Sequence, residues 1–459
     1  MPTATAKSGA ITLLHTACGA GILAMPFAFK TNGLILGTVS IIFSCMCATF
    51  GLMCQAKASK YSPHPNAISF FQLAQLTYPS LGVVFDIAIA IKCFGVSVSY
   101  LIVVGDLLPQ IVNDIFQIDS LSDSLLLNRK LHITLVMFFI VGPLCFIKKL
   151  DSLKHASTIA ISSVAYLALL VIFHFIWPSQ EIKDLRGTVD WLKPKPDTVD
   201  GSFLSSFTIF VFAYTCHHNT FSVISDLNNK TVPNIQKMIL IAMCSALLIY
   251  TIIGTMGYAT FGNNIRGNII TMYPSSISTT IGRIGILFLV MFAYPLQCHP
   301  CRASIHNILT HYSCKTDNTI NDENSPLTEN AGVSQIENDI HLEENSPLVH
   351  VSTPDLADKQ FILITITILI CSYLLAITVR SLATMLSVVG ATGSTSISFI
   401  LPGIFAYKLI GSEYQQNHNS PGYSGAIPTS LKIFKKLALC LSIWGVIVMV
   451  TSLYSTFFL

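Results

Sequence analysis

The sequence predicts an all-α integral membrane protein with eleven transmembrane helices, of which the first and the sixth are broken. Its 459 residues are 52% hydrophobic and 11% charged, with a mean hydropathy of +0.63, whereas a soluble domain carries about 25% charged residues. Eleven apolar stretches each approach the roughly 20 residues needed to cross about 30 Å of hydrocarbon. Glycine, proline and polar residues interrupt the first and the sixth stretch, which indicates that both helices are discontinuous.

The predicted spans form one transmembrane domain over residues 1–459. No basic stretch with a short apolar core and a cleavage site precedes the first span, so we expect this span to be retained. With a cytosolic N-terminus, 15 of the 26 Lys and Arg residues lie on the cytosolic side and 10 on the opposite side, as the positive-inside rule favours. The net charge of +3 gives no reason to expect a nucleic-acid partner. The spans are 8–29, 33–55, 81–107, 131–149, 155–177, 203–226, 238–261, 279–300, 361–380, 382–408 and 434–457.

The first span contains GAGILAMP, residues 19–26, which is unfavourable for a continuous helix. In a helix interior Gly costs about 1 kcal/mol and Pro about 3 kcal/mol, and in hydrocarbon every freed backbone group needs a partner. Where such a break faces a watery cavity, the N–H groups that begin a half-helix suit a carboxylate, and unwound carbonyl groups suit an ammonium. The break therefore predicts a binding site for a zwitterion, with close packing of small residues as the alternative.

The third span carries a lysine at membrane depth. Lys92 lies eleven residues from Leu81, about 16 Å along the helix axis and near the middle of the membrane. We expect its ammonium to face the bundle as a counter-charge, and the alternative is that its stem carries the charge toward the interface. Asp86 and Asp106 lie near the ends of the span, where solvated positions are expected.

The sixth span is interrupted five spans after the first, where a five-plus-five inverted repeat places its second broken helix. Its sequence FAYTCHHNTFSVISDL, Phe212–Leu227, puts His217 and His218 at membrane depth. Ionisable groups at that depth are candidates for function, and a histidine pair titrates near neutral pH. A hydrogen-bonded structural histidine is an equally good interpretation of either one. The small residues of the tenth span are explained by close helix packing.

The cysteines predict neither disulfides nor a metal site. None of the 13 lies in a predicted non-cytosolic loop, and most lie in apolar spans, where Cys behaves as a small hydrophobe. The one close pair, Cys298 and Cys301 in CHPC, lies at the cytosolic end of the eighth span without a second pair of ligands. We therefore expect no metal and no cofactor.

The stretch 312–358 interrupts the apolar pattern. It contains ten Asp and Glu residues, few aromatics and two copies of ENSPL. Such a composition cannot bury enough apolar surface to offset the entropy lost on ordering, so we expect a disordered acidic cytosolic loop. Ser325 and Ser346, each followed by Pro, are candidates for phosphorylation, and ENSPLV at 344–349 resembles an acidic dileucine-type signal for a sorting adaptor. A plain linker explains these features equally well.

Five motifs occur in order along essentially the whole chain. They are GAGILAMPFAF in span one, GVSVSYLIVVGDLLP in span three, CHHN followed by Asp226–Leu227 in span six, YPLQCHPCR in span eight and GATGSTSISFILPG in span ten. Together they resemble the amino acid/auxin permease family, and in particular the fungal vacuolar amino acid transporters. The resemblance implies a leucine-transporter-type fold, in which spans 1–5 and 6–10 form an inverted repeat and span 11 is added. It also implies secondary active transport of amino acids, mostly proton-coupled, by alternating access.

The resemblance further implies a set of substrate-binding residues. The backbone groups offered to the substrate carboxylate would be those of Gly19, Ala20, Gly21 and Ile22. The neighbouring side chains or backbone groups would come from spans one, three, six, eight and ten, namely Thr16, Tyr100, Thr215, Cys216, Tyr294 and Ser394.

One departure from the family pattern bears on the coupling ion. Sodium-coupled relatives carry an Asn near the break of span one and a hydroxyl residue just before the Pro of span eight, whereas this sequence has Thr16 and Ala293 in those regions. Because a sodium ion needs several oxygen ligands, we predict proton coupling without a sodium requirement. The candidate proton carriers, in falling order, are His217, His218 and Asp106, with Lys92 as a further candidate for coupling.

Direction, substrate and function class follow from the same features. In an acidic vacuole a proton symporter carries its substrate toward the cytosol, so we expect export through the vacuolar membrane, whereas a proton antiporter would load the vacuole. Lys92 and the histidine pair favour acidic or neutral amino acids over basic ones. The main alternative function is a membrane receptor that senses amino acids with little or no transport. We expect no enzyme activity, because no catalytic constellation lies in a soluble domain. The expected partners are an amino acid, protons and the lipid bilayer.

Overall fold

The computed structural model describes residues 4–62, 68, 70–79, 81–117, 125–147, 154–192, 203–322, 358–416 and 428–458. Within these residues the chain is helical, and an isolated backbone bridge joins Ala4 to Leu227. The α-helices are α1 (Ala6–Ala17), α2 (Gly21–Ala58), α3 (Phe70–Thr77), α4 (Leu81–Phe116), α5 (Arg129–Val136), α6 (Gly142–Cys145), α7 (Lys154–Ile176), α8 (Gln180–Asp184), α9 (Phe203–Ala213), α10 (His217–Asp226), α11 (Val232–Phe261), α12 (Ile277–Asp322), α14 (Asp358–Thr378), α15 (Leu382–Val389), α16 (Leu401–Leu409), α17 (Ser412–Gln416) and α18 (Thr429–Phe458). The π-helical turns are η3 (Met137–Val141), η7 (Gly390–Ser394) and η8 (Ser396–Ile400).

Eight helical stretches among the described residues are long and apolar enough to cross a membrane. One of them, Gly21–Tyr61, has 41 residues and would extend about 60 Å if straight, twice the hydrocarbon thickness. Gly33 divides this stretch, because its φ of 73° and ψ of 172° are not helical, and this left-handed φ suits glycine. The N–H of Leu34 donates to the carbonyl of Asp190 at 2.9 Å, as expected where a new helix begins without its own acceptors.

Two helices of the bundle are interrupted. α1 ends at Ala17 and α2 begins at Gly21, so residues 18–20 leave the helix. α9 ends at Ala213 and α10 begins at His217, so residues 214–216 leave it too. Both interruptions fall within the stretches whose composition is unfavourable for a continuous membrane helix.

α12 overlaps the start of the expected acidic loop 312–358. This helix runs to Asp322, and residues 323–357 of the expected loop lie outside the described residues. Ser325, Ser346 and the motif 344–349 lie outside the described residues.

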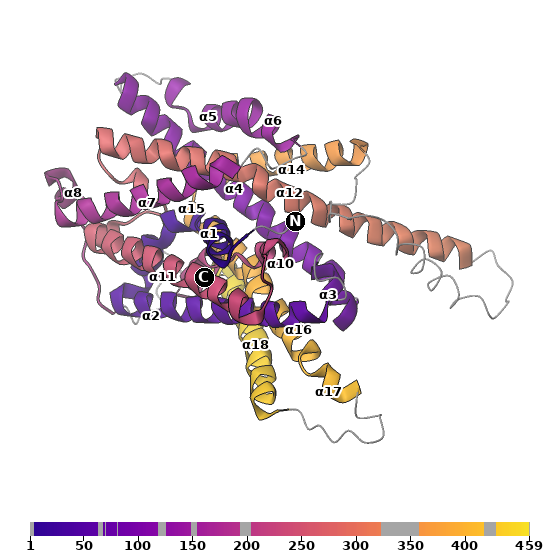
Figure 1. Cartoon of the computed structure of the whole chain (residues 1–459). Helices are drawn as coiled ribbons and strands as arrows, with labels where there is room; N and C mark the ends of the chain where they lie inside the picture. Colours follow the sequence, from indigo (N-terminus) through magenta and orange to yellow (C-terminus); the bar gives the residue numbers. More distant parts are fainter. Residues whose placement is uncertain are drawn as a thin grey trace.

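The helices are arranged around a large apolar core, and a small second cluster is formed by Cys54, Ala406, Ile410 and Ala438. α4 lies along α12, α2 lies along α11, and α16 lies beside α18 (Figure 1). The bridge at Ala4 brings the start of α1 to the end of α10, since the N–H of Ala4 donates to the carbonyl of Asp226 at 3.1 Å. Large apolar side chains on outer faces, such as Met46 and Leu363, are exposed, which suits a surface that lipid covers.

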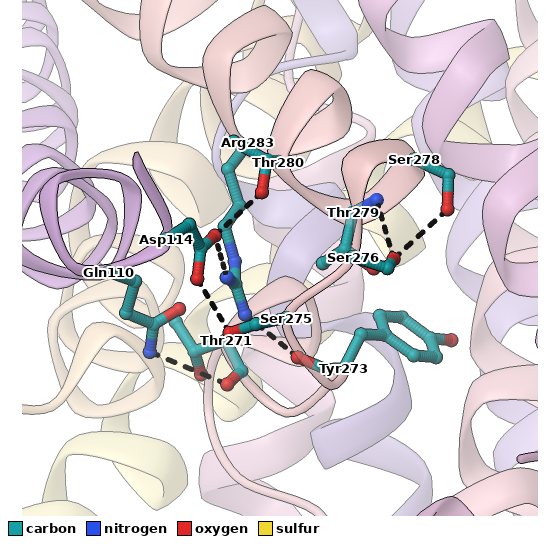
Figure 2. Close-up of polar contacts among 10 residues, drawn as sticks. All are labelled: Gln110, Asp114, Thr271, Tyr273, Ser275, Ser276, Ser278, Thr279, Thr280 and Arg283. Carbon is teal, nitrogen blue, oxygen red and sulfur yellow. Dashed lines mark hydrogen bonds and ion pairs between the residues drawn. The ribbon is translucent and has the colours of Figure 1, made fainter. Parts of the chain in front are cut away.

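A buried ion pair joins α4 to the start of α12. Arg283 Nη1 lies 2.6 Å from Asp114 Oδ2, and the two side chains are 3% and 6% exposed. Asp114 also accepts hydrogen bonds from the hydroxyl groups of Ser275 and Thr280, and Arg283 donates to the carbonyl of Tyr273 at 2.7 Å (Figure 2). The cluster therefore anchors one end of α4 to α12 and to the loop that precedes α12.

Candidate functional site

The break between α1 and α2 is shaped by close contacts at its glycines. A Cβ on Gly19 would lie 2.9 Å from the hydroxyl oxygen of Tyr100, and a Cβ on Gly21 would lie 3.0 Å from the ring of Phe212. Both distances are too short for an ordinary carbon contact, so side chains at these two positions would separate the break from α4 and α9. Pro26 has no N–H to donate to the carbonyl of Ile22, which weakens the first turns of α2.

The break between α9 and α10 contains no Gly or Pro, and hydrogen bonds from side chains stabilise it. The hydroxyl of Tyr250 on α11 donates to the carbonyl of Ala213 at 3.0 Å, which satisfies the end of α9. Thr215 donates to the carbonyl of Val211 at 2.9 Å and accepts a hydrogen bond from Ser398 at 3.2 Å. These bonds replace the backbone bonds that a continuous helix would make.

The two breaks face each other. The side-chain amide of Asn219 on α10 donates to the hydroxyl of Thr16 on α1 at 3.1 Å. Among the described residues, the N–H groups of Ala20 and Gly21 have no hydrogen-bond acceptor. These N–H groups lie at the positive end of α2, so the contact region offers the kind of donors that a carboxylate binds.

Three side chains from three helices form a polar cluster beside the second break. Lys92 Nζ on α4 lies 3.1 Å from His218 Nε2 on α10 and donates to Gln297 Oε1 on α12 at 3.1 Å. Lys92 is 3% exposed, and the ion pairs within the described part of the chain do not include it. Because an ammonium only donates, a charged Lys92 requires an unprotonated Nε2 on His218, with the ring proton on Nδ1.

The other expected proton carriers lie elsewhere. His217 is directed toward α2, where its Nε2 lies 3.0 Å from the carbonyl oxygen of Ala48. Asp106 lies near the other end of α4, 3.5 Å from Arg129 Nε, and accepts a hydrogen bond from Asn268 at 3.4 Å. The candidates inferred from the sequence therefore occupy three separate environments.

The remaining expected substrate contacts differ in their surroundings. Cys216 is fully buried at the second break. Tyr294 shares a hydrogen bond with Ser372 of α14 at 2.5 Å, so its hydroxyl is engaged with α14. Ser394 lies in the π-helical turn η7, and its hydroxyl is buried without a hydrogen-bond partner.

Gln297 and Asn219 were not identified as site residues from the sequence. Each is a polar amide side chain within an apolar or broken span. This unusual polarity is the feature of the sequence that could have identified them as site residues. Gln297 is 6% exposed and holds Lys92, while Asn219 joins the two breaks. Within the described residues no cluster of His, Cys, Asp or Glu is suited to hold a metal ion.

Apolar helices of membrane-spanning length, together with two discontinuous helices, define a class of protein, the polytopic helical membrane proteins. The family model for the transmembrane amino acid transporter protein matches residues 2–454, and the chain belongs to this family. This match confirms the family inferred from the five motifs, and it is a family of transporters rather than enzymes.

Individual relatives cover nearly the whole chain. The chain is 51% identical to vacuolar amino acid transporter 6 of Saccharomyces cerevisiae, over 98% of each protein. It is 49% identical to vacuolar amino acid transporter 5 of the same yeast, over 99% of this chain and 98% of the relative. A more distant relative, sodium-coupled neutral amino acid transporter 7 of Danio rerio, is 25% identical over 91% of this chain and 82% of the relative.

Proposed function

We propose that the protein is a secondary active amino acid transporter of the vacuolar membrane, which exports amino acids to the cytosol in symport with protons and needs no sodium. The observation that supports this most directly is the contact of the two broken helices through Asn219 and Thr16, next to free N–H groups at the start of α2. The names of the yeast relatives support the substrate class and the membrane.

The proposed architecture has eleven crossings arranged as a five-plus-five inverted repeat with one added helix. Eight stretches meet the length and composition of a span, and Gly33 divides one of them into two. α9 with α10, and α5 with η3 and α6, would supply two discontinuous crossings. With the N-terminus in the cytosol, the end of α4 that carries Asp114 lies on the vacuolar side.

The proposed site binds the substrate through its two charged groups. The free N–H groups of Ala20 and Gly21 would receive the carboxylate, and the carbonyl groups freed at the breaks would receive the ammonium. The buried charge of Lys92 lies beside the second break, and a second positive charge nearby is costly in a low dielectric. Acidic or neutral amino acids are therefore favoured over basic ones.

The proposed proton carrier is His218 rather than His217. His218 contacts the buried ammonium of Lys92 directly. Protonation of its ring would remove an acceptor and place two positive charges side by side, so His218 would take up a proton only in an arrangement of the helices that separates it from Lys92. His217 contacts only a backbone carbonyl through Nε2. Sodium independence is supported by the absence of Ser and Thr from residues 281–300. The Danio rerio relative, which is named as sodium-coupled, is only 25% identical to this chain.

The test is transport by the purified full-length protein in liposomes. Labelled acidic, neutral and basic amino acids are offered under an imposed pH gradient, with sodium replaced by choline, and protein-free liposomes serve as the control. We expect flux that follows the pH gradient and is unchanged by choline. Flux that requires sodium would refute proton coupling, and specific binding without flux would indicate a receptor.

A further inference from the structure

A second polar pocket lies where α4 meets the loop before α12 and the start of α15. Its volume is about 400 Å³, within the range of about 300–1,000 Å³ typical of small-molecule sites. It is separate from the broken helices and from the Lys92 cluster. Its polar lining includes Asp106, Gln110, Arg266, Asn268, Thr271 and Arg380.

Two arginines supply positive charge to this pocket. Arg266 and Arg380 are both exposed, and neither takes part in an ion pair within the described residues. The guanidinium group presents several N–H donors in one plane, a geometry that matches the two oxygens of a carboxylate. The pocket is thus equipped to hold an anionic group.

Oxygen acceptors line the same pocket. Asp106 shares its carboxylate between Arg129 and the amide of Asn268. The Asn268 side chain is only 4% exposed, and its Oδ1 has no donor. Gln110 donates to the carbonyl of Thr271 at 3.4 Å (Figure 2), while its Oε1 is buried without a donor. Buried acceptors without partners are costly, and an ammonium has three hydrogens to donate.

Hydrogen bonds hold the walls of the pocket in place. The hydroxyl of Thr271 donates to the carbonyl of Asn268 at 2.7 Å, which tightens the loop. Arg129 donates to the carbonyl groups of Ala376 and Val379 at 3.1 and 3.3 Å, at the end of α14 directly before Arg380. Hydrogen bonds therefore link the segments of the chain that contain the arginines and the acceptor oxygens.

We propose that this pocket is a second amino-acid-binding site, which holds the free zwitterion before it reaches the broken helices. Arg266 and Arg380 bind the carboxylate, and Asp106, assisted by Asn268 and Gln110, binds the ammonium. The inference rests on the proposed function, since it assigns the same substrate class to both sites. In the proposed topology the pocket opens on the vacuolar side, from which substrate is exported.

The test compares the wild-type protein with the double variant Arg266→Gln/Arg380→Gln. Equilibrium binding of labelled alanine and of labelled glutamate to full-length protein in nanodiscs is expected to give two molecules per wild-type chain and one per variant chain. In liposomes, the KM of the variant is expected to rise about tenfold, as loss of charge-assisted bonds implies, with little change in the maximal rate. Arg186→Gln, at an exposed position outside the pocket, is the matched control and should behave as wild type.

Three results would decide against the second site. One bound molecule per wild-type chain, with flux intact, would refute it and leave the proposed function standing. An unchanged KM in the double variant would do the same. Full recovery in Arg266→Lys/Arg380→Lys would mean that the arginines only attract anions through their charge, because Lys lacks the bidentate geometry. A wild-type protein with neither binding nor flux would instead refute the proposed function itself.

Discussion

At the residue scale, individual side-chain hydroxyl groups stabilise the break between α9 and α10. Residues 214–216 leave the helix although they include neither Gly nor Pro. The hydroxyl groups of Tyr250 and Thr215 take over the carbonyl groups of Ala213 and Val211. In hydrocarbon these carbonyl groups would otherwise lack partners, so the break is stabilised from α11 and from its own side chain.

Replacing Tyr250 by Phe is expected to destabilise the protein by about 1–3 kcal/mol, because the carbonyl of Ala213 would remain buried and unpaired. The measurement is the thermal unfolding midpoint in detergent. Tyr214→Phe is the matched control, since the hydroxyl of Tyr214 is buried beside Tyr250 without a hydrogen-bond partner. Equal midpoints for the two variants would show that the Tyr250 hydrogen bond does not stabilise the break.

At the element scale, α4 is held to α12 at both ends of their contact. Lys92 reaches Gln297 in one region, and Asp114 reaches Arg283 in the other. The second pair is almost completely buried and carries additional hydrogen bonds from Ser275 and Thr280. Removing one partner of a buried ion pair leaves an uncompensated charge, whereas removing both does not.

Asp114→Ala is therefore expected to cost about 3–5 kcal/mol of stability, seen as a lower unfolding midpoint. The double variant Asp114→Leu/Arg283→Met is expected to recover much of this loss. Asp184→Ala on the exposed helix α8 serves as the control and should change stability by about 0.5 kcal/mol or less. If the double variant were less stable than Asp114→Ala, the ion pair itself would be the stabilising feature.

At the scale of the whole molecule, the Lys92 cluster connects the broken helix α10 to α4 and α12. Alternating access requires two arrangements of the helices, and a ligand shifts their populations only if it interacts differently with each. Protonation of His218 would disrupt its contact with Lys92, which provides such a difference. In the proposed mechanism, proton binding and helix movement are therefore linked through this contact.

His218→Gln is expected to abolish uptake driven by a pH gradient while leaving exchange of labelled for unlabelled amino acid across the liposome membrane. Exchange needs substrate binding and helix movement but no net proton transfer, so the pair of assays separates coupling from folding. The adjacent His217→Gln is the control and should retain the response to pH. Loss of that response in His217→Gln alone would restore His217 as the carrier.

Much of the membrane architecture was accessible from the sequence, because local composition controls it. The family motifs, the apolar stretches and the unfavourable residues of GAGILAMP are all read from neighbouring positions. The acidic composition of 312–358 predicts a loop; α12 includes its first residues, to Asp322, and residues 323–357 lie outside the described residues. Local composition does not show how far an existing helix extends into a polar segment.

The sequence by itself determined the family, the apolar segments and the first broken helix, because backbone conformation and hydrophobic burial depend on residue type. Only the tertiary structure decided which polar groups meet. His217 and His218 are adjacent, yet about 100° apart around the helix, so one contacts α2 and the other contacts Lys92. Their partners lie more than one hundred residues away along the chain, and packing of the helices alone brings them together.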